Sequence, residues 1–291
     1  MGEAFALLTG MVWSLAVVLF KRSGEDIPAF SLNLFRVAVS GVLLVACLIG
    51  SGGSLWAGRD AHDYFVLGAS GIIGVAISDT LFHLGLNRVG AGINAIIDCL
   101  YAPSVVFFAF VLIGERIGPW QLAGMGLVVA GVVLTGRLAP PPGATARTLL
   151  AGIVYGVLAM VTLGLGIVIA KPILDRSSLL WVAAVRQVAS LAVMLPVALA
   201  LPERRQILAV FRPSRDWRFS LTGTLLGSFV AVLLWTAGMK YTQASIAAIL
   251  NQTSTIYTLV LASLFLGETF GWRKGVATVF ALAGILMVVL G

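Results

Sequence analysis

The sequence predicts an all-α integral membrane protein whose ten transmembrane helices form two inverted five-helix repeats around a central cavity. Three observations support this fold class. Hydrophobic residues make up 59% of the 291 residues and charged residues only 11%, with a mean hydropathy of +1.04. Ten apolar stretches approach the length of about 20 residues that crosses a bilayer as a helix. The third observation is an internal repeat with an offset of 153 positions.

The composition places the chain in a bilayer, because so few polar residues cannot cover the surface of a water-soluble globule. The apolar stretches lack the period-two alternation of barrel strands, which favours helices. Little chain remains between the stretches, so no soluble domain is expected. In order, the expected spans cover residues 3–21, 28–49, 64–86, 91–113, 117–136, 148–171, 178–201, 219–239, 243–266 and 272–290.

The internal repeat is clearest where the fourth and ninth spans end. Gly114-Glu115 closes one apolar stretch and Gly267-Glu268 closes the other. Such self-similarity at a fixed offset indicates a tandem duplication. The same offset pairs Gly74 with Gly227, Leu81 with Leu234, Gly85 with Gly238, Ala91 with Ala244, Ala95 with Ala248, Asp98 with Asn251 and Gly131 with Gly284.

The duplication predicts two units, residues 1–137 and 148–291, joined by a proline-rich linker over residues 138–147. The consecutive prolines prevent one helix from running through the join. Because each unit holds five spans, an odd number, the second unit is expected to lie upside down relative to the first. Inverted repeats of this kind are typical of transporters.

The basic residues serve as orientation signals in this reading. The chain has a net charge of +7 and a pI near 9.9, but the basic residues are scattered between spans, which argues against nucleic acid as a partner. The connections after the odd-numbered spans carry twelve Lys and Arg, and the other connections carry five. The positive-inside rule then places both termini outside the cytoplasm.

Buried polar residues are the main clue to a functional site, since a charge at the bilayer centre costs about 2.5 to 3.5 kcal/mol on insertion scales. Five expected helices carry polar stripes at helical spacing. Burying these stripes toward one centre creates a hydrated or ligand-filled cavity. The stripes are Arg36 and Ser40; Asp79, His83 and Asn87; Asn94, Asp98 and Tyr101; Arg186 and Ser190; and Asn251, Ser254, Thr255 and Thr258.

Asp98 is the strongest functional candidate, because its counterpart Asn251 shows that the fold does not need a charge at this position. Its carboxylate suits a substrate amino group or a coupling proton. Asp79 has two open readings, as part of the site or as the partner of Arg36. The full predicted substrate-binding set is Asp98, Asn251, Tyr101, Asn94, Thr255, Trp235, Asp79 and His83.

Other polar residues have structural readings beside functional ones. Arg36 and Arg186 are expected to brace the bundle by pairing with a carboxylate or with free carbonyls. A lone helical histidine such as His83 is more often a hydrogen-bonded packing residue than a proton relay. Glu115 and Glu268 at the two helix ends suit a structural joint near the membrane interface. Tyr101 and Trp235 either line the cavity or anchor the chain at the lipid interface.

The pattern resembles the ten-span drug/metabolite transporter superfamily, specifically its EamA-like exporters. The matching features are the duplicated five-span unit, the doubled Gly-Glu pair and Arg36 in the second span, and they cover essentially the whole chain. The resemblance implies a central cavity lined chiefly by spans 3, 4, 8 and 9. It also implies export of small metabolites such as amino acids by alternating access. Members generally have both termini in the cytoplasm, which conflicts with the charge count and leaves the orientation open.

The sequence therefore favours a secondary active transporter, in the direction of export, that moves a small polar metabolite such as an amino acid through the cytoplasmic membrane. A proton is a candidate coupling ion, and a monomer is expected because one duplicated chain supplies both halves. The alternatives are an intramembrane enzyme and a channel. The enzyme lacks a His-Glu-x-x-His pair and a Gly-x-Ser-x-Gly elbow, while a channel would need a continuous polar pore.

No cofactor or metal is expected from the sequence. The two cysteines, Cys47 and Cys99, both lie inside apolar stretches, where a thiol packs as a small hydrophobic group. They are too few for a metal cluster or a disulfide framework. A phosphate-binding glycine loop followed by Lys and Ser or Thr is also missing from the sequence, which argues against ATP-driven pumping.

Overall fold

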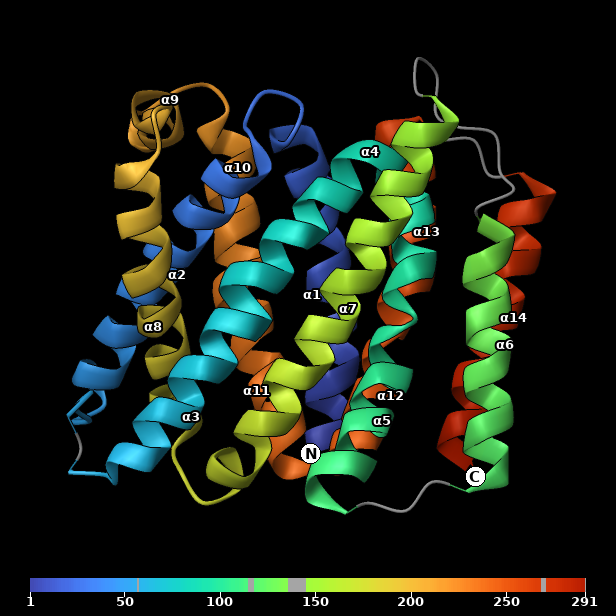
Figure 1. Ribbon diagram of the computed structural model, residues 1–291, viewed down its shortest axis with the longest axis horizontal. Helices are drawn as coiled ribbons and strands as arrows, with labels where there is room; N and C mark the ends of the chain where they lie inside the picture. The colour runs from blue at the N-terminus through green and yellow to red at the C-terminus, as the bar shows by residue number, and fades with distance from the viewer. Residues whose placement is uncertain (57, 115–117, 136–144, 268–270, 291) are drawn as a thin grey trace.

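A computed structural model describes residues 1–56, 58–114, 118–135, 145–267 and 271–290 (Figure 1). Every regular element in these ranges is helical, as the sequence predicts. Six helical segments are long and apolar enough to cross a membrane, which supports a multi-pass membrane protein. They are Gly2–Ser23, Ala29–Gly50, Ala61–Asp98, Ala146–Asp175, Leu179–Ala200 and Trp217–Tyr241, and shorter apolar helices include Tyr101–Ile113 and Thr253–Leu266.

The first part of the chain begins with α1 (Gly2–Ser23) and α2 (Ala29–Gly50). One long helical segment follows, made of α3 (Ala61–Gly71), the π-helix η1 (Ile72–Ile77) and α4 (Ser78–Asp98). Its start is fixed by the Asp60 side chain, which accepts a hydrogen bond from the backbone N–H of His62 at 3.3 Å. The helices α5 (Tyr101–Ile113) and α6 (Pro119–Thr135) complete this part.

The second part begins with α7 (Ala146–Asp175), whose first turn is capped by the hydroxyl of Thr145. It continues through α8 (Leu179–Ala200) and the short α9 (Arg204–Leu208) and η2 (Ala209–Phe211). A second interrupted helix is formed by α10 (Trp217–Gly223), the π-helix η3 (Thr224–Val230) and α11 (Ala231–Tyr241). The last elements are α12 (Ala244–Asn251), α13 (Thr253–Leu266) and α14 (Trp272–Leu290).

Irregular backbone occurs at matching positions of the two parts. The π-helices η1 and η3 each interrupt one long helix. The predicted span 91–113 is divided between the end of α4 and α5 around Cys99 and Leu100, and the predicted span 243–266 is divided between α12 and α13 at Gln252. Gly90 also breaks α4, with φ of 82° that only glycine adopts readily. Broken helices place free backbone groups and helix ends inside a bundle, where they can surround a ligand.

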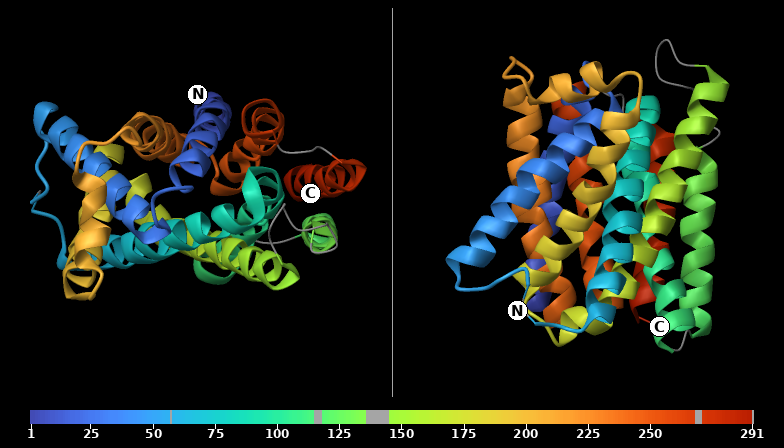
Figure 2. Two further views of the ribbon diagram at one scale, coloured as in Figure 1. Left: turned by 90° about the horizontal axis from the view of Figure 1, so that it is seen from above. Right: turned by 60° about the vertical axis from the view of Figure 1, so that its left-hand side comes forward.

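The helices from the two parts of the chain interleave (Figures 1 and 2). Both views show α6 and α14 packed side by side at one end of the bundle, and α7 lies along α4. The two termini lie at the same edge. In Figure 1, α1 starts at this edge and α7 starts at the opposite one, so that these two helices run in opposite directions.

Small residues allow the closest helix approach in the bundle. A Cβ built at Gly166 of α7 would lie 2.7 Å from the Cα of Gly74 in η1, too close for any side chain. The hydroxyl of Ser70 donates to the carbonyl of Gly166 beside this contact. Close backbone approach together with a polar contact is the usual way in which helices associate in lipid.

Candidate functional site

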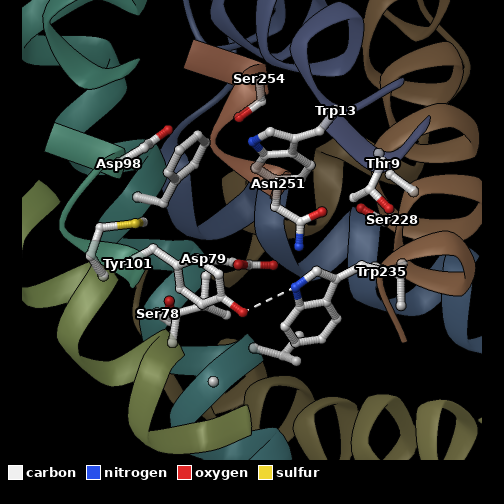
Figure 3. Close-up of a pocket in the computed structure, with 18 of the residues that line it drawn as sticks. Thr9, Trp13, Ser78, Asp79, Asp98, Tyr101, Ser228, Trp235, Asn251 and Ser254 are labelled. Carbon is white, nitrogen blue, oxygen red and sulfur yellow. Dashed lines mark hydrogen bonds between the residues drawn. The ribbon is translucent and has the colours of Figure 1, made fainter. Parts of the chain in front are cut away.

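A cavity of about 140 Å³ lies between helices from both parts of the chain (Figure 3). This volume is many times what a single water molecule requires. The residues that line it come from α1, α2, η1, α4, α5, α7, α8, η3, α11, α12 and α13. They are Thr9, Gly10, Trp13, Arg36, Gly74, Val75, Ser78, Asp79, Phe82, Asp98, Tyr101, Met160, Leu163, Ala183, Arg186, Gln187, Gly227, Ser228, Ala231, Val232, Trp235, Asn251, Gln252 and Ser254.

The broken helices bring Asp98 and Asn251 to this cavity. Asp98 is the last residue of α4 and Asn251 the last residue of α12. The side-chain amide of Asn94, one turn earlier, donates to Asp98 Oδ1 at 3.2 Å and fixes its position. In contrast, neither amide atom of Asn251 has a hydrogen-bond partner among the described residues, although both are buried. The same holds for Oε1 of the neighbouring Gln252.

Aromatic side chains form part of the wall. Trp235 Nε1 donates to the hydroxyl of Tyr101 at 3.1 Å, which ties α11 to α5 across the cavity (Figure 3). Trp13 and Phe82 pack with ring centroids 5.6 Å apart. Buried Trp and Tyr present an apolar face together with one polar group, so this wall can contact an apolar part of a ligand while its polar atoms stay paired.

Arg36 is almost completely buried and has several partners. Its guanidinium forms an ion pair with Asp79 at 3.3 Å, and its Nε donates to the hydroxyl of Ser228 at 2.8 Å. Its Nη1 donates to His83 Nε2, and its Cζ lies 4.2 Å from the ring centroid of Phe20. Because these contacts join α2 to α4, η3 and α1, they hold four helices in register.

His83 lies behind this cluster and outside the residues that line the cavity. A guanidinium has no acceptor, so His83 Nε2 must accept the hydrogen bond from Arg36 and its ring proton belongs on Nδ1. In this geometry the imidazole positions Arg36. Its role as a proton relay stays a prediction.

Arg186 of α8 is also buried, with 4% of its surface exposed, and it lines the cavity. Its Cζ lies 5.6 Å from the ring centroid of Trp235. Unlike Arg36, it makes no ion pair among the described residues, and its Nε and Nη2 have no hydrogen-bond partner there. The sequence predicted a bracing role through pairing with a carboxylate or carbonyls, and the geometry differs from that expectation at these two atoms.

Seven of the residues singled out from the sequence meet at the cavity, namely Asp98, Asn251, Tyr101, Trp235, Asp79, Arg36 and Arg186. Asn94 and Thr255 lie behind it. Thr255 is buried and donates to the carbonyl of Ala95 at 3.2 Å, which joins α13 to α4. Sequence reasoning missed several polar or aromatic lining residues: Thr9, Trp13, Ser78, Gln187, Ser228 and Gln252. Gln187 and Gln252 each follow a residue already singled out, whereas Thr9 and Trp13 gave no signal.

Glu115 and Glu268 lie outside the described residues. The glycines before them show why each pair contains glycine, because Gly114 ends α5 with φ of 74° and Gly267 ends α13 with φ of 65°. This left-handed conformation is the common C-cap of a helix and favours glycine. Within the described ranges, no group of three or more His, Cys, Asp or Glu side chains could hold a metal ion.

The helical fold and the enclosed polar cavity define a multi-pass membrane protein of the transporter class. A model of the EamA-like transporter family matches residues 1–137 and 150–290. The chain therefore belongs to the EamA-like transporter family, as the resemblance in the sequence indicates, and it is not an enzyme. Its coarse partners follow from this family: a lipid bilayer and a small-molecule substrate.

Two kinds of named relative match part of the chain. A chloroplastic WAT1-related protein of Arabidopsis thaliana is 30% identical over 122 residues, which is 42% of this chain and 29% of that protein. An S-adenosylmethionine uptake transporter of Rickettsia conorii is 28% identical over 141 residues, which is 48% of this chain and 46% of that protein. The matched regions thus span less than half the length of either relative.

A solved crystal structure has the same fold. It superposes with a TM-score of 0.71 at 18% sequence identity and covers 98% of this chain and 96% of its own. At this identity the match concerns the arrangement of the helices alone.

Proposed function

We propose that this protein is a secondary active transporter that moves a small polar metabolite such as an amino acid by alternating access, in the direction of export. The observation that carries the proposal is a cavity lined by polar side chains from both halves, placed where two helices are broken at Asp98 and Asn251. Transporters commonly bind their substrates where discontinuous helices meet between two repeats.

The architecture we propose for this function has ten membrane spans in two inverted units, residues 1–137 and 148–291, with the linker at residues 138–147. The opposite directions of α1 and α7 support it, as do the matching π-helices η1 and η3. Rocking of one unit against the other would open the cavity to each side in turn. One chain supplies both units, so we propose a monomer in the cytoplasmic membrane.

In this proposal Asp98 and Asn251 recognise the substrate at equivalent positions of the two units. Asp98 faces an amino group or a coupling proton, while the unpaired amide of Asn251 orients another polar group of the substrate. Trp235, Tyr101 and Asp79 complete the wall. The Rickettsia relative is named for uptake and not export, so the direction of transport has to be measured.

Proteoliposomes loaded with a panel of labelled amino acids test the function. Accumulation against a concentration gradient, driven by an imposed proton gradient, is the expected result and separates a coupled transporter from a channel. Passive equilibration alone would support the channel. A failure to move any member of a panel of amino acids, nucleosides and cationic drugs would contradict the proposal.

Asp98→Asn is the matched variant, because Asn already occupies the equivalent position 251. We expect it to fold normally and to lose proton-driven accumulation, since the neutral amide cannot carry a proton or pair with an amino group. Asn94→Ala, which removes only the hydrogen bond that positions Asp98, should give a partial loss. An unchanged pH dependence of transport in Asp98→Asn would remove Asp98 from the mechanism.

A further inference from the structure

The two buried arginines that line the cavity differ in how their hydrogen-bond donors are used. Arg36 has a carboxylate, a hydroxyl and an imidazole as partners. Arg186 has Nε and Nη2 buried without a protein partner, although only 4% of its surface is exposed. Leaving a buried charged donor unpaired is costly, so a group from outside the protein is the natural complement of Arg186.

The internal repeat explains why Arg186 has no partners. The three residues that bind Arg36 are Asp79, His83 and Ser228. Moved by the repeat offset of 153 positions, they fall on Val232, Thr236 and Val75. Two of these are apolar, and the hydroxyl of Thr236 donates to the carbonyl of Val232 in its own helix.

The surroundings of Arg186 leave room for a ligand. Val75 and Val232 both line the cavity. Gly74 lies beside the guanidinium, and a Cβ at that position would be 3.1 Å from Nη2. The face of Trp235 lies 5.6 Å from Cζ, within the range of a cation–π contact that restrains the guanidinium plane.

The charges of the cavity define the ligand class further. Four charged side chains line it, and two of them, Arg36 and Asp79, neutralise each other. The remaining two are Arg186 and Asp98, which form no ion pair with each other. A positive and a negative group held apart in one cavity are complementary to a zwitterion. The guanidinium presents a planar fork of N–H donors, the geometry that binds a carboxylate through two hydrogen bonds.

We propose that Arg186 binds the carboxylate of the substrate, so that the transported class is small carboxylic acids with a positive group elsewhere, amino acids included. The proposal rests on the proposed transport function and assigns its anionic subsite. Asp98 takes the positive group, and the unpaired side chains of Asn251 and Gln252 meet further polar atoms of the ligand. Arg186 is then a specificity-determining residue and not a structural brace.

The test compares matched pairs of ligands on the purified full-length protein. Each pair is an amino acid and its carboxamide, for example L-leucine and L-leucinamide, which have the same shape but differ in the negative charge. Apparent affinities are obtained from the dependence of the unfolding temperature on ligand concentration. We expect at least one acid in the panel to bind about tenfold or more tightly than its carboxamide, the effect of one charge-assisted hydrogen-bond pair.

Two substitutions connect this preference to Arg186. Arg186→Gln should weaken binding of the acid by about tenfold or more and leave the carboxamide unchanged, so that the preference disappears. The apo variant should unfold at the same temperature as the wild type or higher, because no protein partner is lost. Val232→Asp places a carboxylate at the position equivalent to Asp79, where it should pair with Arg186 and displace the acid. Val232→Asn is its uncharged control and should retain the preference.

The outcomes separate the inference from the transport function. Arg186-dependent binding of acids without flux in proteoliposomes would support the subsite and contradict the transport function. Flux of amides or amines that is unaffected in Arg186→Gln would support transport and overturn the subsite. The inference is also overturned if no acid in the panel binds or if the preference for acids persists in Arg186→Gln, since water alone would then satisfy the guanidinium.

Discussion

The cavity contains two corners that the internal repeat makes equivalent, one at Arg36 and one at Arg186. Each arginine lies in the second span of its repeat and is followed four residues later by a serine that donates to its backbone carbonyl, Ser40 at 2.5 Å and Ser190 at 2.7 Å. The helices therefore present the two guanidinium groups in the same local way. Only the partners differ, because Asp79 and Ser228 face Arg36 while their counterparts are Val232 and Val75.

This difference teaches what a duplication provides. With two copies of the same buried arginine, one can be neutralised and used to join helices, and the other can keep its donors for a ligand. A symmetric protein would have either two braces or two unpaired charges. The asymmetry between Arg36 and Arg186 is the same kind as that between Asp98 and Asn251, and all four side chains line one cavity.

The largest effect is expected from Arg36→Gln. This substitution leaves Asp79 without its cation and His83 and Ser228 without their donor. Breaking a buried ion pair from one side typically costs about 3 to 5 kcal/mol. Because one fifth of the Asp79 side chain is exposed, we expect a loss near the lower end, about 3 kcal/mol. Thermal or denaturant unfolding in detergent measures it.

The matched control is Arg186→Gln, for which no loss of stability is expected. If both variants lose equal stability, the two corners are equivalent in energy and the contrast between them is wrong. The double variant Arg36→Gln with Asp79→Asn sharpens the test, since removing both charges should recover part of the loss.

The fold class was predictable because it depends on features that lie in the sequence itself. Apolar length and composition determine helices in a bilayer, and the Gly-Glu pairs already indicated the helix ends that Gly114 and Gly267 form. The breaks within the predicted spans at residues 91–113 and 243–266 were not foreseen. Hydropathy averages over a window, so it is blind to one residue such as Gly90 that leaves the helical conformation.

The site was only partly predictable for a related reason. Charged residues such as Asp79 and Asp98 are conspicuous in an apolar sequence, and they were found. Trp13 and Thr9 of α1 resemble ordinary residues of an apolar helix, and only the packing of α1 against α11 and α13 places them at the cavity. Whether a buried arginine is paired depends on the facing helices, which is why Arg36 and Arg186 received the same reading from the sequence.

The comparison extends to the glycines next to the two corners, with a smaller expected effect. Gly74 and Gly227 are equivalent in the repeat. A Cβ at Gly227 would lie 2.7 Å from the Cβ of Ala16, whereas a Cβ at Gly74 first meets the flexible end of Arg186 at 3.1 Å. Gly227→Ala should therefore destabilise the protein by about 1 to 3 kcal/mol through overpacking. Gly74→Ala should cost less stability but weaken ligand binding, and the reverse order in unfolding and binding assays would contradict this assignment.

The smallest effect concerns the hydrogen bond between Trp235 and Tyr101, which lies on the Arg186 side of the cavity. Tyr101→Phe keeps the ring and removes only the acceptor of Trp235 Nε1, so we expect a loss of about 1 kcal/mol in unfolding free energy. Trp235→Phe removes the same bond together with part of the ring that faces Arg186. If the bond is a separate contribution, the double variant loses less than the sum of the two single losses. Strict additivity in this cycle would show that the bond does not hold Trp235 against Arg186, and the orientation of the guanidinium would then depend on the ligand alone.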